Sequence, residues 1–194
     1  MIHQVTDFTH LLGKLEGLSA TQIEAHLGLY AGYVKKLNEI EEKLSKVDRA
    51  LSNYSYGEYS ELKRREAVAF NGSYLHLIYF GSLSPKPAKM PASLEGAITD
   101  SFGSVEAYLK DLKASAASTP GWVLTTKNKV DGKLHNYILF EHHIGLPAHQ
   151  EIIMAMDCWE HSYMIDYGTK KPDYVDAFLK NVDWNTVVER LEKA

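Results

Sequence analysis

The chain has 194 residues, of which 45% are hydrophobic and 24% are charged, and its formal net charge at pH 7 is −4. This length and composition fit one large domain or two small ones with a sizeable buried core. Charges of both signs are interspersed, so the composition gives no sign of a general nucleic-acid binder or an anionic-membrane binder. A small anionic substrate is still compatible with this charge.

The helical half of the chain begins at Ser19, which we predict to be an N-cap, with Gln22 at the capping-box position. A helical pattern runs from Ile23 to Leu37, and a charged helical segment follows over residues 39–51. After a break at residues 53–57, a second helical pattern covers residues 61–83. Two helices joined by a turn predict an antiparallel helical hairpin.

The second half begins after a stretch, residues 82–91, that holds three of the six prolines and cannot be regular helix or central strand. We predict a hairpin domain over 1–83, a Pro-rich linker over 84–91 and an α/β domain over 92–194. Within that domain we predict helices over 92–102 and 105–115, then strands over 122–126, 134–141 and 151–156 with a turn at 129–133. Helices return near Trp159 and over 174–180 and 185–193. The fold class is therefore α+β, with a small three-stranded antiparallel sheet.

The cellular setting is indicated by a single cysteine, Cys158, which excludes an intrachain disulfide and is typical of a reducing compartment. The first seven residues have neither the basic start nor the apolar core of a secretory signal. No stretch approaches the roughly 20 apolar residues that span a bilayer. We therefore expect a cytoplasmic protein without a membrane partner.

The sharpest group of ionisable residues is DCWEH at 157–161. Asp157 ends an apolar run, which carries its carboxylate toward the interior, where a charge is costly unless it is paired or bound to a cation. His161 follows four residues later, a spacing at which both side chains can converge on one ion. Carboxylate and imidazole suit iron, manganese and zinc alike. A buried Asp–His hydrogen bond or a helix cap explains this segment equally well.

Two further histidines, His26 and His76, lie on the apolar faces of the hairpin helices. A single histidine in such a place is usually a core residue with satisfied hydrogen bonds. Two of them on helices that pack together, with Asp157 and His161, make a set of three histidines and one carboxylate. This set leaves room for one solvent molecule, which is the layout of a redox-active non-haem site, although spacing alone does not show that the four residues converge.

The residues 157–167, DCWEHSYMIDY, resemble the D-x-W-E-H-A-Y-Y-x-D-Y signature of the iron/manganese superoxide dismutase family. The similarity continues through KPDY at 171–174 and NVDW at 181–184, and upstream through SFGS at 101–104 and Gly121-Trp122. In the helical half, SATQIEAH at 19–26 resembles the stretch that leads to the family's first ligand. NGSYLHLIYF at 71–80 resembles the family's N-G-H-x-x-H-x-x-Y-W segment.

The resemblance implies a role for each matching residue. Four side chains fall on the ligands of one iron or manganese ion, with solvent as the fifth ligand: His26, His76, Asp157 and His161. Trp122 and Trp159 fall on aromatic walls of the site, and Tyr79 falls on a tyrosine behind the ligands. Glu160 falls on the residue that bonds the ligand histidine of a partner subunit, and Tyr163 reaches across the same interface. The resemblance thus implies a homodimer or a tetramer of such dimers.

The family also has a hydrogen-bond donor to the solvent ligand, usually Gln or His, which comes either from four residues before the second ligand or from the sheet. Here the first place is Gly72, which has no side chain that could donate. His142, fifteen residues before Asp157, matches the sheet position, and His143 would face the other way on a strand. The resemblance therefore implies that His142 is this donor and tunes the redox potential. A polar patch at the end of a strand is the alternative for His142 on its own.

The chain departs from the family most in the spacing to its gateway tyrosine, which is eight residues in the family but seven from His26 to Tyr33. At about 100° per residue, a seven-residue step ends about 20° from the same helix face and an eight-residue step about 80° away. The longer spacing would need an extra residue in a π-bulge. We therefore expect a regular helix with Tyr33 at the channel mouth; Tyr30 would be the substitute if Tyr33 pointed away. Other departures are Phe80 in place of Trp, Ser73 in place of His, and no N-terminal L-P-x-L-P-Y segment.

The predicted function is the dismutation of superoxide to dioxygen and hydrogen peroxide by one Fe or Mn ion per subunit, with Tyr33, His142, Glu160 and Tyr163 as the supporting catalytic residues. Two alternatives stay open at this point. A non-enzymatic homologue would keep the fold and the dimer as a structural or metal-storing protein. A redox enzyme with an organic substrate would keep the four ligands, although tight aromatic surroundings argue against a pocket for one. The sequence decides neither between iron and manganese nor between a dimer and a tetramer.

Overall fold

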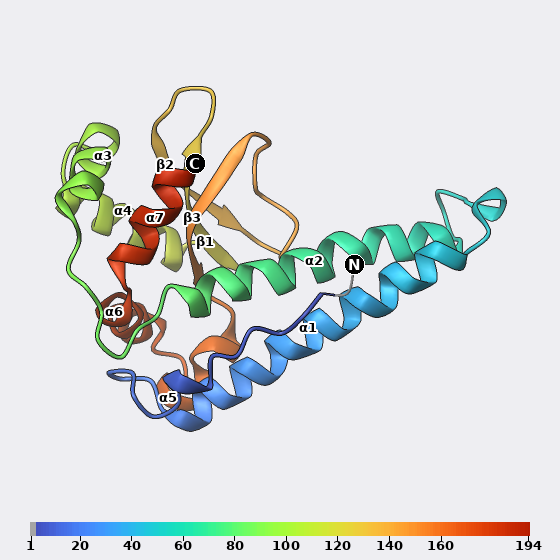
Figure 1. Cartoon of the computed structure of the whole chain (residues 1–194), viewed down its shortest axis with the longest axis horizontal. Coiled ribbons are helices and arrows are strands. Elements are labelled where there is room, and N and C mark those ends of the chain that lie inside the picture. The colour runs from blue at the N-terminus through green and yellow to red at the C-terminus, as the bar shows by residue number, and fades with distance from the viewer. Residues whose placement is uncertain (1–2) are drawn as a thin grey trace.

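The molecule consists of a long helical hairpin and a sheet-containing half that packs against one end of it (Figure 1). A computed structural model describes residues 3–194, so the first two residues of the N-terminal stretch considered for a signal lie outside the described residues. The hairpin is formed by α1 (Ala20–Lys46) and α2 (Glu58–Gly81). This arrangement confirms the predicted α+β fold class. Within residues 3–194 no helix combines the length and apolar character needed to cross a bilayer.

Helix α1 is α-helical without interruption from Ala20 to Lys46. Ser19 is its N-cap, as predicted, because the Ser19 hydroxyl accepts a hydrogen bond from the Gln22 amide at 3.0 Å. The capping-box prediction for the Gln22 side chain is wrong, since that amide bonds the segment around His161 and not the Ser19 N–H. The helix also ends earlier than the predicted Leu51, because the chain becomes extended at Val47 before one 3-10 turn.

The second half contains α3 (Ala92–Phe102) and α4 (Val105–Ala117), then β1 (Trp122–Asn128), β2 (Leu134–Leu139) and β3 (Gln150–Asp157), and finally α5 (Met164–Tyr167), α6 (Lys171–Asn181) and α7 (Trp184–Lys193). The antiparallel sheet has the order β2-β1-β3. Trp122 at the start of β1 is paired with Asp157 at the end of β3. The register therefore brings an indole beside the buried carboxylate, and α2 packs on β3 from the hairpin side.

Two boundaries near the site differ from prediction. Strand β2 ends at Leu139 and not at Glu141, because its ladder with β1 ends at the Trp122–Leu139 pair, where β1 begins. A tight turn over residues 141–144 follows, so His142 lies in a turn and not on a strand. The helix expected near Trp159 is a 3-10 turn, Glu160–Ser162, followed by α5.

The core of the second half contains Tyr108 of α4, which is 1% exposed and hydrogen-bonded to Thr125 of β1 at 2.9 Å. Burial raises the pKa of Tyr108 well above its ordinary value. Above about pH 10 the unfolded chain releases this proton and the folded chain keeps it, so stability falls by about 1.4 kcal/mol per pH unit for this group. We expect Tyr108→Phe to flatten the loss of stability measured by urea unfolding between about pH 9 and 11. Tyr54→Phe, at a position 93% exposed, should leave that slope unchanged.

Candidate metal centre

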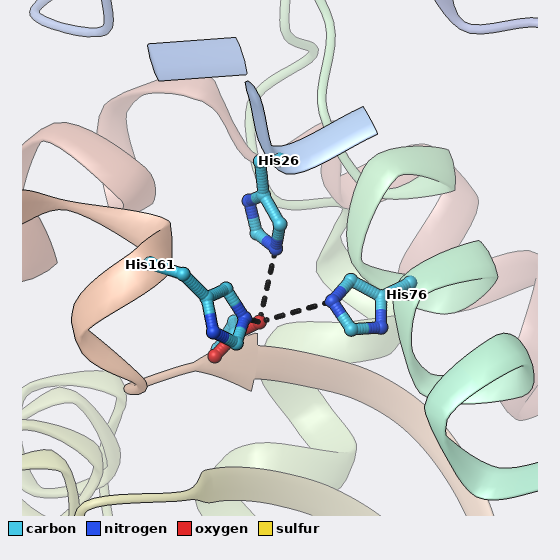
Figure 2. A group of neighbouring side chains, drawn as sticks. His26, His76 and His161 are labelled. Atoms are coloured by element: carbon cyan, nitrogen blue, oxygen red, sulfur yellow. Dashed lines mark hydrogen bonds and ion pairs between the residues drawn. The ribbon is translucent and has the colours of Figure 1, made fainter. Parts of the chain in front are cut away.

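Four side chains from distant parts of the chain meet where the hairpin touches the sheet. His26 comes from α1, His76 from α2, Asp157 from the last residue of β3 and His161 from the 3-10 turn that follows. One possible ligand atom from each lies within 4.8 Å of all the others. Figure 2 shows the three labelled imidazoles pointing inward, with dashed lines that converge on one oxygen atom. The structure therefore brings together all four residues that the sequence indicated as ligands.

The oxygen at the centre is Oδ2 of Asp157, which lies 3.0 Å from His26 Nε2, 3.1 Å from His161 Nε2 and 3.4 Å from His76 Nε2. Two donors bound to one transition metal at about 2.1 Å, with about 90° to 120° between the bonds, would lie about 3.0 to 3.6 Å apart. The observed separations fall in that range. The three separations from Asp157 thus fit donors of a single ion, and all four candidate ligand atoms lie within 4.8 Å of one another.

The hydrogen bond of His76 gives a stronger reason to expect a cation. His76 Nδ1 lies 2.5 Å from the carbonyl oxygen of Gly72, which can only accept, so Nδ1 carries the proton. Burial and the neighbouring His26 lower the pKa of His76 to about 3, so the ring is neutral at pH 7. The lone pair of His76 Nε2 then faces Asp157 Oδ2. This nitrogen is buried and has no hydrogen-bond partner within residues 3–194. Two lone pairs that face each other in the interior repel unless a cation lies between them.

Asp157 is fully buried. Burial alone would raise the pKa of its carboxyl, but the hydrogen bonds with His161 and His26 outweigh burial and hold that pKa well below its usual range. The second carboxylate oxygen, Oδ1, accepts from the Trp159 amide at 2.9 Å. The Asp157 carbonyl accepts from the hydroxyls of Tyr174 at 2.6 Å and Ser162 at 3.1 Å. The carboxylate is therefore both ionised and fixed in direction.

Aromatic rings enclose the four residues. Trp122 and Tyr79 are fully buried, with ring centroids 5.1 Å from His76 and 4.9 Å from His26 respectively. Trp159 is partly buried and lies 6.5 Å from the His161 ring. His161 itself keeps 27% of its side chain exposed, whereas His26, His76 and Asp157 are fully buried. The centre is therefore enclosed on most sides, and His161 is the most exposed of the four residues.

Tyr33 and His142 lie next to this centre and bond each other, with 2.6 Å between Tyr33 Oη and His142 Nε2. Trp122 Nε1 donates to His142 Nδ1 at 2.9 Å, so the neutral ring carries its proton on Nε2 and donates it to Tyr33. The Tyr33 ring stacks on His76 with 5.4 Å between the centroids. Tyr33 therefore faces the centre from an unbulged α1, while Tyr30 is buried and accepts a bond from the Thr6 amide.

Comparisons with known proteins show which family this chain belongs to. Residues 90–190, more than half of the chain, match the family model described as iron/manganese superoxide dismutases, C-terminal domain. An Aquifex aeolicus protein named superoxide dismutase [Fe] is 38% identical over 100% of this chain and 93% of its own length. A Haloferax volcanii protein named superoxide dismutase [Mn] 2 is 34% identical over 85% of this chain and 82% of its own length. The chain belongs to the iron/manganese superoxide dismutase family. The family predicted from the sequence is thus confirmed, and so is the prediction of an oxidoreductase.

The two other residues singled out from the dismutase signature lie beside His161. Glu160 is exposed, whereas Tyr163 is 7% exposed and stacks on Tyr174 with 5.3 Å between the ring centroids. Sequence reasoning missed Gln22, a fully buried amide that donates to the His161 carbonyl at 2.6 Å and accepts from the Ile165 amide at 3.0 Å. Gln22 thereby joins the start of α1 to the segment that carries His161. Its only local signal was its position three residues after the N-cap Ser19, which favoured the capping box.

Gly72 makes room for Tyr33 in this dismutase centre. A Cβ at residue 72 would lie 2.4 Å from Cδ1 of Tyr33, a distance at which the ring must move. We expect Gly72→Ala to lower stability by about 1 to 3 kcal/mol through overpacking and to break the Tyr33–His142 bond while metal content is kept. Superoxide consumption should fall by at least about tenfold. Gly96→Ala is the matched control, because a Cβ at this helical position meets nothing within 4 Å. Equal activity of the two variants would show that Tyr33 is not held by Gly72.

Proposed function

We propose that this protein dismutates superoxide, converting two superoxide anions and two protons to dioxygen and hydrogen peroxide, as a cytoplasmic homodimer. The observation that carries the proposal is the set of three imidazoles around one buried carboxylate with the Tyr33–His142 pair beside it. Membership of the iron/manganese superoxide dismutase family and the names of its relatives support the same reaction. The single, buried Cys158 is in keeping with a reducing compartment.

One iron or manganese ion would be held by the Nε2 atoms of His26, His76 and His161 and by the Asp157 carboxylate. When bound, such an ion supplies one-electron chemistry, taking an electron from one superoxide and giving one to the next. The chain's own contribution is the single negative charge of Asp157 against three neutral donors, together with the direction of each ligand. Gly72 fixes His76, and the Trp159 amide fixes Asp157, so the ligand positions do not depend on the ion alone.

Protons for the peroxide product would come through Tyr33. Because His142 donates its Nε2 proton to Tyr33 Oη, the hydroxyl proton of Tyr33 is free to point toward a small anion at the centre. Burial raises the pKa of Tyr33, and the charges of Asp157 and Glu141 raise it further, so the hydroxyl stays protonated at neutral pH. His142 and Tyr33 therefore act as a pair that holds a proton beside the ligands.

The second subunit would cover the side of the centre that the single chain leaves open. Glu160 is exposed next to the partly exposed His161, and the apolar side chains of Met164 and Ile165 that follow are 45% and 56% exposed. Apolar groups in such a place favour contact with another protein surface. We infer that Glu160 of one subunit accepts a hydrogen bond from His161 of the other and that Tyr163 lies at this interface. Dimerisation would then complete the site.

The test is metal analysis of the purified protein after loading with iron or with manganese, combined with a superoxide-consumption assay and repeated on His76→Ala. We expect activity with at least one of the two metals in the wild type and loss of both metal and activity in the variant. Sedimentation of the wild type should give a dimer or a multiple of it. A metal-replete wild type that does not consume superoxide would defeat the enzymatic proposal and favour a metal-storing or structural homologue.

A further inference from the structure

His142 reaches the centre from a turn that has few bonds of its own. The turn over residues 141–144 is closed by the Ile144 amide to the Glu141 carbonyl at 3.4 Å and by the Phe140 amide to the Ile144 carbonyl at 3.3 Å, both at the long end for hydrogen bonds. Its other side chains are exposed: Glu141, His143 and Ile144. The hydrogen bonds within this turn are therefore too weak to fix by themselves the direction in which His142 donates its proton.

Helix α2 supplies the contact that the turn lacks. The Asn71 side-chain nitrogen donates to the His142 carbonyl oxygen at 2.7 Å, the shortest of the hydrogen bonds that hold the backbone of this turn. A carbonyl oxygen can only accept, so the amide nitrogen of Asn71 and not its oxygen faces the turn. The bond joins two positions 71 residues apart in the chain.

The neighbour of Asn71 in the helix serves the same centre. The Gly72 carbonyl accepts from His76 Nδ1, and its missing side chain admits the Tyr33 ring. Two consecutive residues of α2 thus contact three of the groups that must be aligned: His142, His76 and Tyr33. Displacement of the turn from Asn71 would move His142 relative to both Tyr33 and Trp122, which bond its two ring nitrogens.

We propose that Asn71 is a positioning residue for His142, and that its amide holds the 141–144 turn to the helix that carries the ligand His76. The effect of Asn71 on turnover rests on the proposed dismutase function, whereas its effect on the geometry of His142 does not. The hydrogen bond to the His142 carbonyl is the contact through which Asn71 acts.

The test compares Asn71→Ala and Asn71→Asp with the wild type by two measurements. The first is the proton resonance of the Trp122 indole N–H, recorded by NMR on the full chain without metal. It reports the Trp122–His142 bond, and the Trp159 indole N–H, which has no partner among the described residues, gives an internal reference. We expect the Trp122 resonance of both variants to move toward that of Trp159. The second measurement is superoxide consumption per bound metal, which should fall by about tenfold, the scale of one lost hydrogen bond.

Asp has the shape of Asn, but a carboxylate oxygen would then face the His142 carbonyl oxygen. The Asp variant therefore distinguishes loss of the hydrogen bond from loss of side-chain volume. His143→Ala, at the exposed neighbour in the same turn, is the matched control and should leave both measurements unchanged. A wild-type Trp122 resonance in either Asn71 variant, or a shifted resonance with wild-type activity, would overturn the proposal. If the loaded wild type proves inactive, the dismutase function fails by itself, and the indole resonance still decides whether Asn71 positions His142.

Discussion

Asp157→Asn is expected to abolish metal retention and, with it, superoxide consumption. The carboxylate oxygen of Asp157 is the atom on which three imidazole nitrogens converge, and Asp157 carries the only negative charge among the four proposed ligands. An amide has the same shape but no charge, and its nitrogen would present protons to the centre. Loss of a hydrogen bond behind a ligand already lowers metal affinity by about 10- to 100-fold, so loss of a charged ligand should exceed about 100-fold.

The measurement is metal content after dialysis against a weak chelator, followed by the activity of the same samples. Asp176→Asn is the matched control, because Asp176 is an exposed residue of α6 that pairs with Lys113 at 2.7 Å and is not one of the four clustered residues. Thermal melting of the metal-free proteins checks that the site variant folds. An Asp157→Asn protein that keeps one ion per subunit through dialysis would show that the carboxylate is not a ligand.

Much of the candidate metal centre could be predicted from the sequence because its signals are local. Asp157 and His161 stand in one short motif at the end of an apolar strand, and the structure places both at the centre. His26 and His76 were indicated by the apolar face of a helix, and helical periodicity places such a face against the core with little help from the rest of the chain. The seven-residue step from His26 to Tyr33 is also local, and a regular α1 turns it into a shared helix face.

The features that could not be predicted from the sequence depend on contacts between segments that are distant in the chain. The end of β2 is set by where β1 begins, so the alternation over residues 134–141 could not reveal the turn that holds His142. Gln22 lies in the first turn of α1, where its side chain could bond either the Ser19 N–H or the segment around His161, 139 residues away. In the structure it donates to the His161 carbonyl. The tautomer of His142 likewise follows from Trp122, twenty residues upstream, across the sheet end.

Substitution of His142 is also expected to lower superoxide consumption strongly. His142→Ala should keep the metal, because all four proposed ligands remain, and should lower superoxide consumption by about 100-fold, the lower range for a positioned proton donor or acceptor. The variant removes the bond to Tyr33 and leaves the buried Trp122 indole without its acceptor. The measurement is the rate per bound metal, with metal content determined on the same sample.

His142→Gln is the informative companion, because a carboxamide has one accepting and one donating end. Its oxygen can accept from Trp122 Nε1 while its nitrogen donates to Tyr33 Oη, which are the two roles that the imidazole fills. We therefore expect Gln to restore most of the activity lost in the alanine variant. If Gln fails while the fold and the metal are kept, the position of the imidazole proton matters beyond the two hydrogen bonds. If alanine itself is active, Tyr33 receives no support from His142, and the proton must reach the centre by another route.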